Sequence, residues 1–215
     1  MDMLKTDFKK QDKALYSGKV GRFDVIDVPE MNFLMIDGMG NPNTSPAYGR
    51  AVAALYGLGY GLKFFGKPRG VDHVVPPLEG LWWADDMGSF TSRDKDSWKW
   101  RMMIRQPDWV KQADLAEVLE SVVAKTAKKK EAPTDEETLR AVCLERFGEG
   151  LAVQVLHVGP YDAEGPVLEE MHKRFIPDKG FVARGLHHEI YLGDPRKIAP
   201  EKLKTILRQP VAQRN

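Results

Sequence analysis

Residues 33–65, FLMIDGMGNPNTSPAYGRAVAALYGLGYGLKFF, contain the change of pattern that decides the fold. A short apolar run ends at two glycines, which is typical of a buried strand that stops at a turn. The turn cluster NPNTSP then begins a helix, with Ser45 as the N-cap and Pro46 at the first helical position. Apolar residues follow at helical spacing, which predicts a helix that packs on a sheet.

The same order of strand, glycine-bearing turn, helix and strand occurs again in the second half of the chain. LAVQVLHVGPY at 151–161 predicts a strand, AEGPVLEEMHKRF at 163–175 a helix, and HHEIYL at 187–192 the next strand. LEGLWW at 78–83 is the matching strand of the first half, with Glu79 placed over Glu189. This repetition predicts an α+β fold of duplicated β-α-β-β units with pseudo-twofold symmetry around a central ligand groove.

The remaining segments complete the expected domain organisation. We expect an N-terminal polar arm at 1–21 and a single domain at 22–215, whose halves span about 22–110 and 151–208. Helices within 112–147 join the halves, and the second of them, TDEETLRAVCLERFG at 134–148, has a capping box formed by Thr134 and Glu137. APEKLKTILRQP at 199–210 predicts a short closing helix.

Composition and charge exclude several classes of protein. Lys plus Arg number 32 and Asp plus Glu number 31, so no field of one sign is available to a dedicated nucleic-acid binder. The single cysteine, Cys143, allows no internal disulfide and favours a reducing compartment. No signal peptide and no apolar run of membrane-spanning length is present, so we expect a cytoplasmic protein without a membrane partner. No zinc-ligand spacing or phosphate-binding loop occurs, and neither metal nor cofactor is expected.

HHEIY at 187–191 places polar groups inside an expected strand. Because side chains alternate along a strand, His187, Glu189 and Tyr191 share one face, while His188 and Ile190 share the other, which is the expected core face. Glu189 is either a surface residue of an edge strand or a fixed negative charge that lines a pocket. Tyr191 is either a catalytic neighbour of that carboxylate or a half-buried core residue whose hydroxyl is exposed to solvent.

Four of the five tryptophans fall within residues 82–100. On the strand WKWRMMIRQ, Trp98 and Trp100 share the face of Met102 and Ile104, whereas charged side chains occupy the other face. The tryptophans form either a tryptophan-rich core or an aromatic cage for a ligand. Glu79 either forms the opposite wall of the groove or faces solvent.

Five stretches of the chain resemble the GyrI-like (gyrase-inhibitor-like) small-molecule-binding family, and the match is nearest to its stand-alone members. These stretches are DVPEMNFLMIDGMGNPN at 27–43, AYGRAVAALYGLGYGLKF at 47–64, LEGLWW at 78–83, WKWRMMIRQPDWV at 98–110 and HHEIYLGDPRK at 187–197. The resemblance implies a groove between two related halves, in which a glutamate and aromatic walls hold hydrophobic, often cationic, compounds. It identifies Glu189 as the functional carboxylate and Tyr191 as its neighbour. It implies an aromatic wall formed by Trp82 or Trp83 and by Trp98 or Trp100. Glu79, as the counterpart of Glu189, and His187, on the face of Glu189, are further candidate ligand contacts.

The resemblance leaves three functions open. The protein binds or sequesters a hydrophobic, planar or cationic small molecule, or it hydrolyses cyclopropanoid DNA-alkylating compounds, as some stand-alone members do. In the second case Glu189 would activate a water and Tyr191 or a histidine would donate to the developing negative charge. The third is a non-enzymatic module that interacts with a protein such as gyrase. Direct contact with nucleic acid is not expected, and a homodimer is compatible with the sequence.

Overall fold

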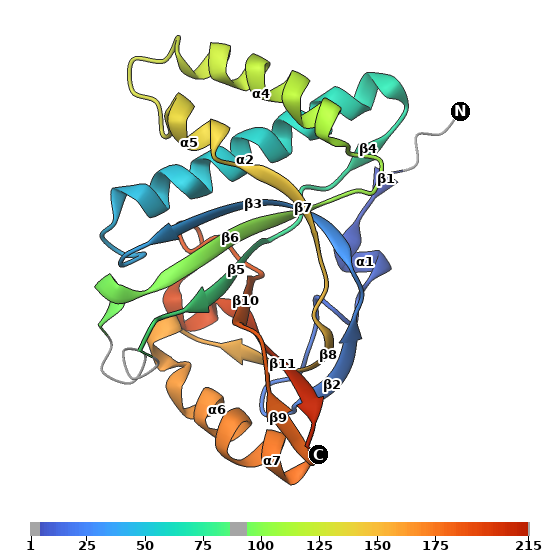
Figure 1. Ribbon diagram of the computed structural model, residues 1–215, viewed down its shortest axis with the longest axis vertical. Coiled ribbons are helices and arrows are strands. Elements are labelled where there is room, and N and C mark those ends of the chain that lie inside the picture. Colours follow the sequence, from blue (N-terminus) through green and yellow to red (C-terminus); the bar gives the residue numbers. More distant parts are fainter. Residues whose placement is uncertain (1–4, 87–93, 215) are drawn as a thin grey trace. The chain divides into compact units, whose positions relative to one another are not determined.

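The computed structural model describes residues 5–86 and 94–214. The described residues divide into two compact units, which are drawn in Figure 1 with the sequence colour scale. Unit 1 comprises residues 5–11, 31–76, 82–86 and 94–147, and unit 2 comprises residues 12–30, 77–81 and 148–214. Each unit has its own antiparallel strands and its own helices.

Unit 1 is built on three antiparallel strands, with β3 (Met31–Met39) paired to β6 (Lys99–Gln106) on one side and to β7 (Cys143–Phe147) on the other. The long helix α2 (Pro46–Gly66) packs on β3 and β6, and α4 (Gln112–Thr126) and α5 (Glu136–Arg140) pack on α2 (Figure 1). Ser45 is the N-cap residue of α2 and Pro46 its first residue, which confirms the predicted start. The short parallel pair β1 (Lys5–Thr6) and β4 (Asp72–His73), the helix α1 (Phe8–Gln11) and the 3₁₀ turns Lys67–Arg69 and Lys95–Ser97 complete this unit.

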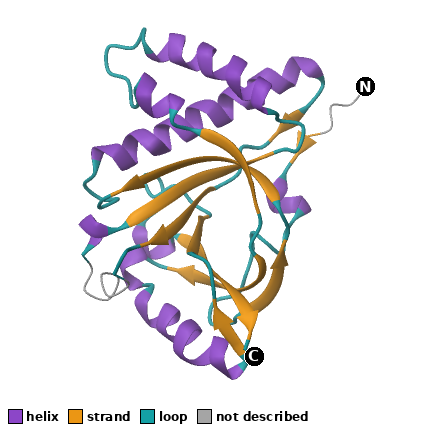
Figure 2. Ribbon diagram, in the orientation of Figure 1, coloured by secondary structure: helices purple, strands orange, loops and turns teal. Residues whose placement is uncertain are grey.

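Unit 2 is built on the strand order β2 (Asp24–Val28), β8 (Gly150–Val158), β11 (Lys204–Gln213) and β10 (His187–Tyr191). The short strand β9 (Phe181–Ala183) pairs with the end of β11. One continuous helical stretch, α6 (Gly165–Glu170), the π-helical turn Met171–Phe175 and α7 (Ile176–Asp178), appears in Figure 2 as helix beside these strands. Two 3₁₀ turns, Tyr161–Ala163 and Pro200–Lys202, also belong to this unit.

The strand β5 (Leu78–Trp83) contributes to both units. Leu78–Leu81 belong to unit 2, where β5 neighbours β10, and Trp82 and Trp83 belong to unit 1.

The two halves of the chain repeat one element order and one pairing. In the first half, β3 and α2 are followed by the short β4 and then by β5 and β6, and β6 pairs antiparallel with β3. In the second half, β8 and the α6–α7 helical stretch are followed by β10 and β11, and β11 pairs antiparallel with β8. This confirms the predicted α+β fold of duplicated β-α-β-β units.

Two of the predicted helices are wrong. Residues 204–213 form β11, which pairs with both β8 and β10, so pairing on two sides outweighs the helical spacing of residues 199–210. Residues 143–147 form β7, and the expected helix over 134–148 is limited to Glu136–Arg140. Its N-cap is Asp135, which accepts from the amide of Thr138, and not Thr134.

The segment expected as a polar arm at 1–21 contains residues that are buried in the structure. Phe8 is buried in unit 1, and Leu15 and Tyr16 are buried in unit 2. Among the described residues, no helix combines the length and the apolar character that a membrane crossing requires.

Candidate functional site

The strand β10 is an interior strand, because it lies between β11 and β5. The interpretation of Glu189 as an edge-strand residue is therefore wrong. His188 and Ile190 are buried on one face, as predicted, and their fractional exposures are 1% and 0%. His187, Glu189 and Tyr191 are half-buried on the other face. We call these three residues the β10 polar row.

The β10 polar row faces the helical layer of unit 2. Glu189 lies opposite Leu207 in the antiparallel register, so the two side chains are on the same face. Leu207 belongs to an apolar cluster with Val155 and with Met171 of the π-helical turn. The carboxylate of Glu189 therefore lies on the apolar side of the strands rather than on a fully hydrated one.

The contacts within the β10 polar row leave one carboxylate oxygen without a hydrogen bond. The hydroxyl of Tyr191 donates to Oε2 of Glu189 at 2.8 Å. Nε2 of His187 lies 3.4 Å from Oε1 of Glu189, and neither ring nitrogen of His187 has a hydrogen-bond partner among the described residues. The ring of Tyr191 packs edge-on against Tyr161, with ring centroids 5.6 Å apart. The row thus combines a carboxylate that accepts one hydrogen bond, the phenol that donates it, and an imidazole without a hydrogen bond.

The predicted tryptophans are brought together in unit 1 by a residue of α2. Tyr48 stacks on Trp82 at 6.2 Å and meets Trp100 edge-on at 5.3 Å, and Trp82 meets Trp98 edge-on at 5.9 Å. Trp82 and Trp100 are buried, so they are core residues of this aromatic cluster, whereas Trp83 and Trp98 are half-buried. No ring contact is recorded for Trp83 among the described aromatic residues.

Glu79 does not face solvent, which was one of its two expected positions. Its fractional exposure is 1%, and its Oε2 lies 3.0 Å from Nε2 of His188. Its Oε1 accepts a hydrogen bond from the hydroxyl of Tyr16 at 3.2 Å. Glu79 is therefore part of a buried polar network in unit 2 rather than an isolated carboxylate.

The buried network extends through a second glutamate. Nδ1 of His188 lies 2.9 Å from Oε2 of Glu149, which also accepts from Nη1 of Arg208 at 2.9 Å. Arg208 also donates to the side-chain oxygen of Gln154 and, at 2.7 Å, to the carbonyl oxygen of Leu15. The Gln154 amide donates to the carbonyl oxygens of residues 14 and 17. The network therefore anchors the segment 14–17 to the strands β8, β10 and β11.

Charge pairing sets the protonation of this network. Burial alone would raise the pKa of Glu149, but His188 and Arg208 outweigh it and lower the pKa to about 2. Burial alone would lower the pKa of His188, but Glu149 and Glu79 outweigh it and raise the pKa to about 8. At neutral pH a negatively charged Glu149 therefore lies between the cations of His188 and Arg208, which compensates the burial of its charge.

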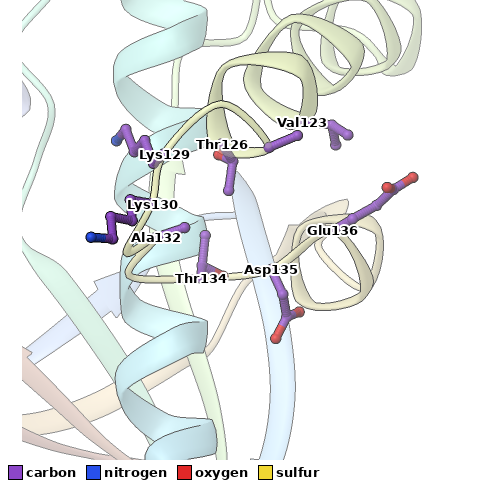
Figure 3. Close-up of a pocket in the computed structure, with 9 residues that line it drawn as sticks. Val123, Thr126, Lys129, Lys130, Ala132, Thr134, Asp135 and Glu136 are labelled. Atoms are coloured by element: carbon purple, nitrogen blue, oxygen red, sulfur yellow. The ribbon is translucent and has the colours of Figure 1, made fainter.

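A hollow in the described part of the chain lies away from the predicted site residues. Its volume is about 400 Å³, and it lies in unit 1 where α4 and α5 meet; Figure 3 labels the residues that line it, among them Thr126, Lys129, Lys130, Asp135 and Glu136. Asp135 pairs with Arg50 and Glu136 with Arg140, and in Figure 3 the lysine side chains extend away from both acids. The hollow lacks convergent polar groups, so it is a weaker candidate than the β10 polar row.

In the part of the chain that the structure describes, metal binding would require a group of His, Cys, Asp or Glu side chains, and thiol chemistry would require a reactive Cys143. No group of three or more His, Cys, Asp or Glu side chains is arranged there to hold an ion. Cys143 is half-buried, and burial, followed by Glu145, raises the pKa of its thiol to about 11, so it is a poor nucleophile at neutral pH.

Sequence reasoning missed Tyr48, Tyr161 and the network residues Tyr16, Glu149, Gln154 and Arg208, and it placed His188 only on the core face. Tyr48 lies among the apolar residues of the predicted helix, and Tyr161 ends the predicted strand 151–161 without any motif. Glu149 lies between two glycines and Arg208 lies inside the apolar run TILRQPV. A charged residue inside an apolar run indicates a buried ion pair, but the sequence does not show which residue is its partner.

Comparison with known proteins gives a consistent assignment. The GyrI-like small molecule binding domain matches residues 22–212 of the chain. An uncharacterised conserved protein from Listeria innocua is 41% identical, with a TM-score of 0.86 over 96% of this chain and 100% of that one. A hydrolase encoded by lin2189 from Listeria innocua is 42% identical, with a TM-score of 0.85 over 97% of this chain and 100% of that one.

A further hydrolase from Listeria innocua is 40% identical, with a TM-score of 0.81 over 96% of this chain and 100% of that one. The search of curated proteins found no match. The domain match covers most of the chain, and the TM-scores of the three matched structures show that they share its fold. The chain belongs to the GyrI-like family of small-molecule-binding domains.

Proposed function

We propose that this protein binds a hydrophobic, planar or cationic small molecule, with Glu189 as its anionic contact. The observation that carries the proposal is the state of the Glu189 carboxylate, which is half-buried and held through Oε2 by Tyr191. Its Oε1 has no hydrogen bond within the described residues. A carboxylate in an apolar setting attracts a cation more strongly than one in water, because the local dielectric is lower.

The aromatic surface of unit 1 suits a ligand of the same chemical class. Trp83 and Trp98 are half-buried, so part of each indole is accessible to a flat ligand, whereas Trp82 and Trp100 are buried. Stacking of a cation on an indole face contributes about 0.5–2 kcal/mol. We assign ligand contact to Trp83 and Trp98 and a supporting role to Trp82 and Trp100.

Hydrolysis is the second candidate, and the similarity to two Listeria innocua hydrolases of 40% and 42% identity favours it. For a cyclopropane conjugated to a carbonyl, Glu189 would accept a proton from water as the oxygen bonds to the methylene carbon. The strained carbon–carbon bond breaks, its electron pair passes to the carbonyl oxygen, and that oxygen takes up a proton. Ring strain supplies much of the driving force, so the protein need only place the water and the proton donor.

Mass spectrometry of a cyclopropanoid alkylator incubated with the protein tests both functions. A hydrolase gives a product heavier by one water, and Glu189→Gln loses this product while Trp98→Leu weakens binding. A binder returns the compound unchanged but quenches tryptophan fluorescence in proportion to occupancy. A module that only contacts a protein such as gyrase gives neither signal, and that result would overturn the proposal.

A further inference from the structure

His187 lies beside the one carboxylate oxygen of the β10 polar row that has no hydrogen bond. Its Nε2 is 3.4 Å from Oε1 of Glu189, and only 14% of its side chain is exposed, against 16% for Glu189. Tyr191 already engages Oε2. Because both ring nitrogens of His187 lack a hydrogen-bond partner among the described residues, Oε1 is the acceptor within reach of its proton.

A second histidine interacts with His187, in addition to its contact with Glu189 on the same strand. His172 of the π-helical turn lies close enough to His187 for the two imidazoles to interact electrostatically. The residue opposite on β11 is Gln209, whose amide donates to the carbonyl oxygens of Arg184 and Pro210 and carries no charge. His187 therefore lies between the carboxylate of Glu189 and a second imidazole.

We propose that His187 determines the charge class of ligand that the site accepts, by occupying Oε1 of Glu189 when protonated and releasing it when neutral. This inference rests on the proposed function of Glu189. A protonated His187 closes an ion pair with the carboxylate and repels a cationic ligand. A neutral His187 leaves Glu189 with a full negative charge and an open oxygen. Neutral planar ligands, which do not need that oxygen, bind equally in both states.

The expected effect of pH depends on the short distance between His187 and Glu189 and on the partial burial of both side chains. Two charges within about 4–6 Å of each other interact more strongly in a partly desolvated place than in water, although solvent and side-chain motion weaken the interaction. Imidazole is the side chain whose charge ordinarily changes between pH 5 and 8. We therefore expect affinity for a permanent cation to rise about tenfold or more across this range.

Titration calorimetry at pH 5.5 and pH 8.5 tests the inference with N-methylquinolinium, a permanent planar cation, and methylnaphthalene, its neutral counterpart in shape. For the unmodified protein we expect cation affinity to rise with pH and affinity for the neutral compound to stay constant. His187→Gln keeps a neutral donor at this position, and it should bind the cation equally well at both pH values, near the level of the unmodified protein at pH 8.5.

His172→Gln is the matched control. It removes the neighbouring imidazole and keeps both His187 and Glu189, so the rise of cation affinity with pH should persist. Burial, followed by His187, lowers the pKa of His172, so His172 is neutral across most of this range. An unchanged rise in His187→Gln would overturn the inference while leaving the proposed function intact. Failure of the unmodified protein to bind the cation at either pH would overturn the proposed function, and this inference with it.

Discussion

Replacement of Glu149 by Gln is the most demanding test of the buried network in unit 2. Glu149 is 3% exposed, and its Oε2 contacts both Nδ1 of His188 and Nη1 of Arg208 at 2.9 Å. The amide has nearly the same shape but no charge. It leaves an imidazolium and a guanidinium in the interior, with only Glu79 to balance them.

Loss of one partner from a buried ion pair costs about 3–5 kcal/mol, because the remaining charge is desolvated without compensation. Glu149 serves two cations, so we expect Glu149→Gln to lie at the upper end of this range at pH 7. Such a loss is a large share of the free energy of unfolding of an ordinary domain. The segment 14–17, which Arg208 and Gln154 hold by its carbonyl oxygens, should loosen with it.

The assay must report on unit 2 itself. All five tryptophans belong to unit 1, so tryptophan fluorescence follows the other unit. Hydrogen exchange measured by mass spectrometry on peptides from β10 and β11, with increasing urea, gives the opening free energy of the strands that carry the network.

The matched control is Glu169→Gln, which removes an exposed pair with Lys173 on the helices of the same unit and should leave exchange unchanged. A loss below about 1 kcal/mol for Glu149→Gln would refute the reasoning, because it would mean that the network does not hold its charges in a desolvated state.

Three further predictions concern stability. The pKa of His188 is raised to about 8, so its contribution of about 2 kcal/mol to the free energy of unfolding is complete below pH 6.5 and is lost as pH rises through 8. Urea unfolding at pH 6 and pH 9 should show this decrease in stability. A higher stability at pH 9 than at pH 6 would contradict the prediction. Gly38→Ala would place a Cβ 2.1 Å from the ring of Trp100 and should cost about 1–3 kcal/mol of unfolding free energy, whereas the control Gly49→Ala, in open space on α2, should be neutral or stabilising; equal thermal shifts would contradict the steric reason. Asp135→Ala should cost about 1 kcal/mol in thermal unfolding by removing the N-cap of α5, whereas Asp135→Asn, which keeps an acceptor, should cost less.

The fold was largely predictable where local pattern and tertiary context agree. The start of α2 at Ser45 and Pro46 and the alternation of β10 are local signals, and the structure follows them. The repeat of strand, helix and strand also indicated the duplicated fold. The C-terminal strand was not predictable in this way, because residues 204–213 have helical spacing and become a strand through pairing with β8 and β10.

The candidate site was predictable only within one strand. His187, Glu189 and Tyr191 share a face because side chains alternate, and that rule needs no partner elsewhere in the chain. Tyr161 and Glu149 could not be placed, since their roles depend on which segments the fold brings together. Sequence patterns describe one helix or strand at a time, whereas the roles of these residues depend on contacts between elements that are distant in the sequence.

Calorimetric titration of N-methylquinolinium at pH 8.5 into the unmodified protein and into Glu189→Gln addresses the central claim most directly. If the Glu189 carboxylate is the anionic contact, the amide variant should lose about tenfold or more in affinity for this cation, since its negative charge lies in a partly desolvated place. Its affinity for methylnaphthalene should be preserved, which shows that the variant remains folded. Equal affinity of both proteins for the cation would contradict the account.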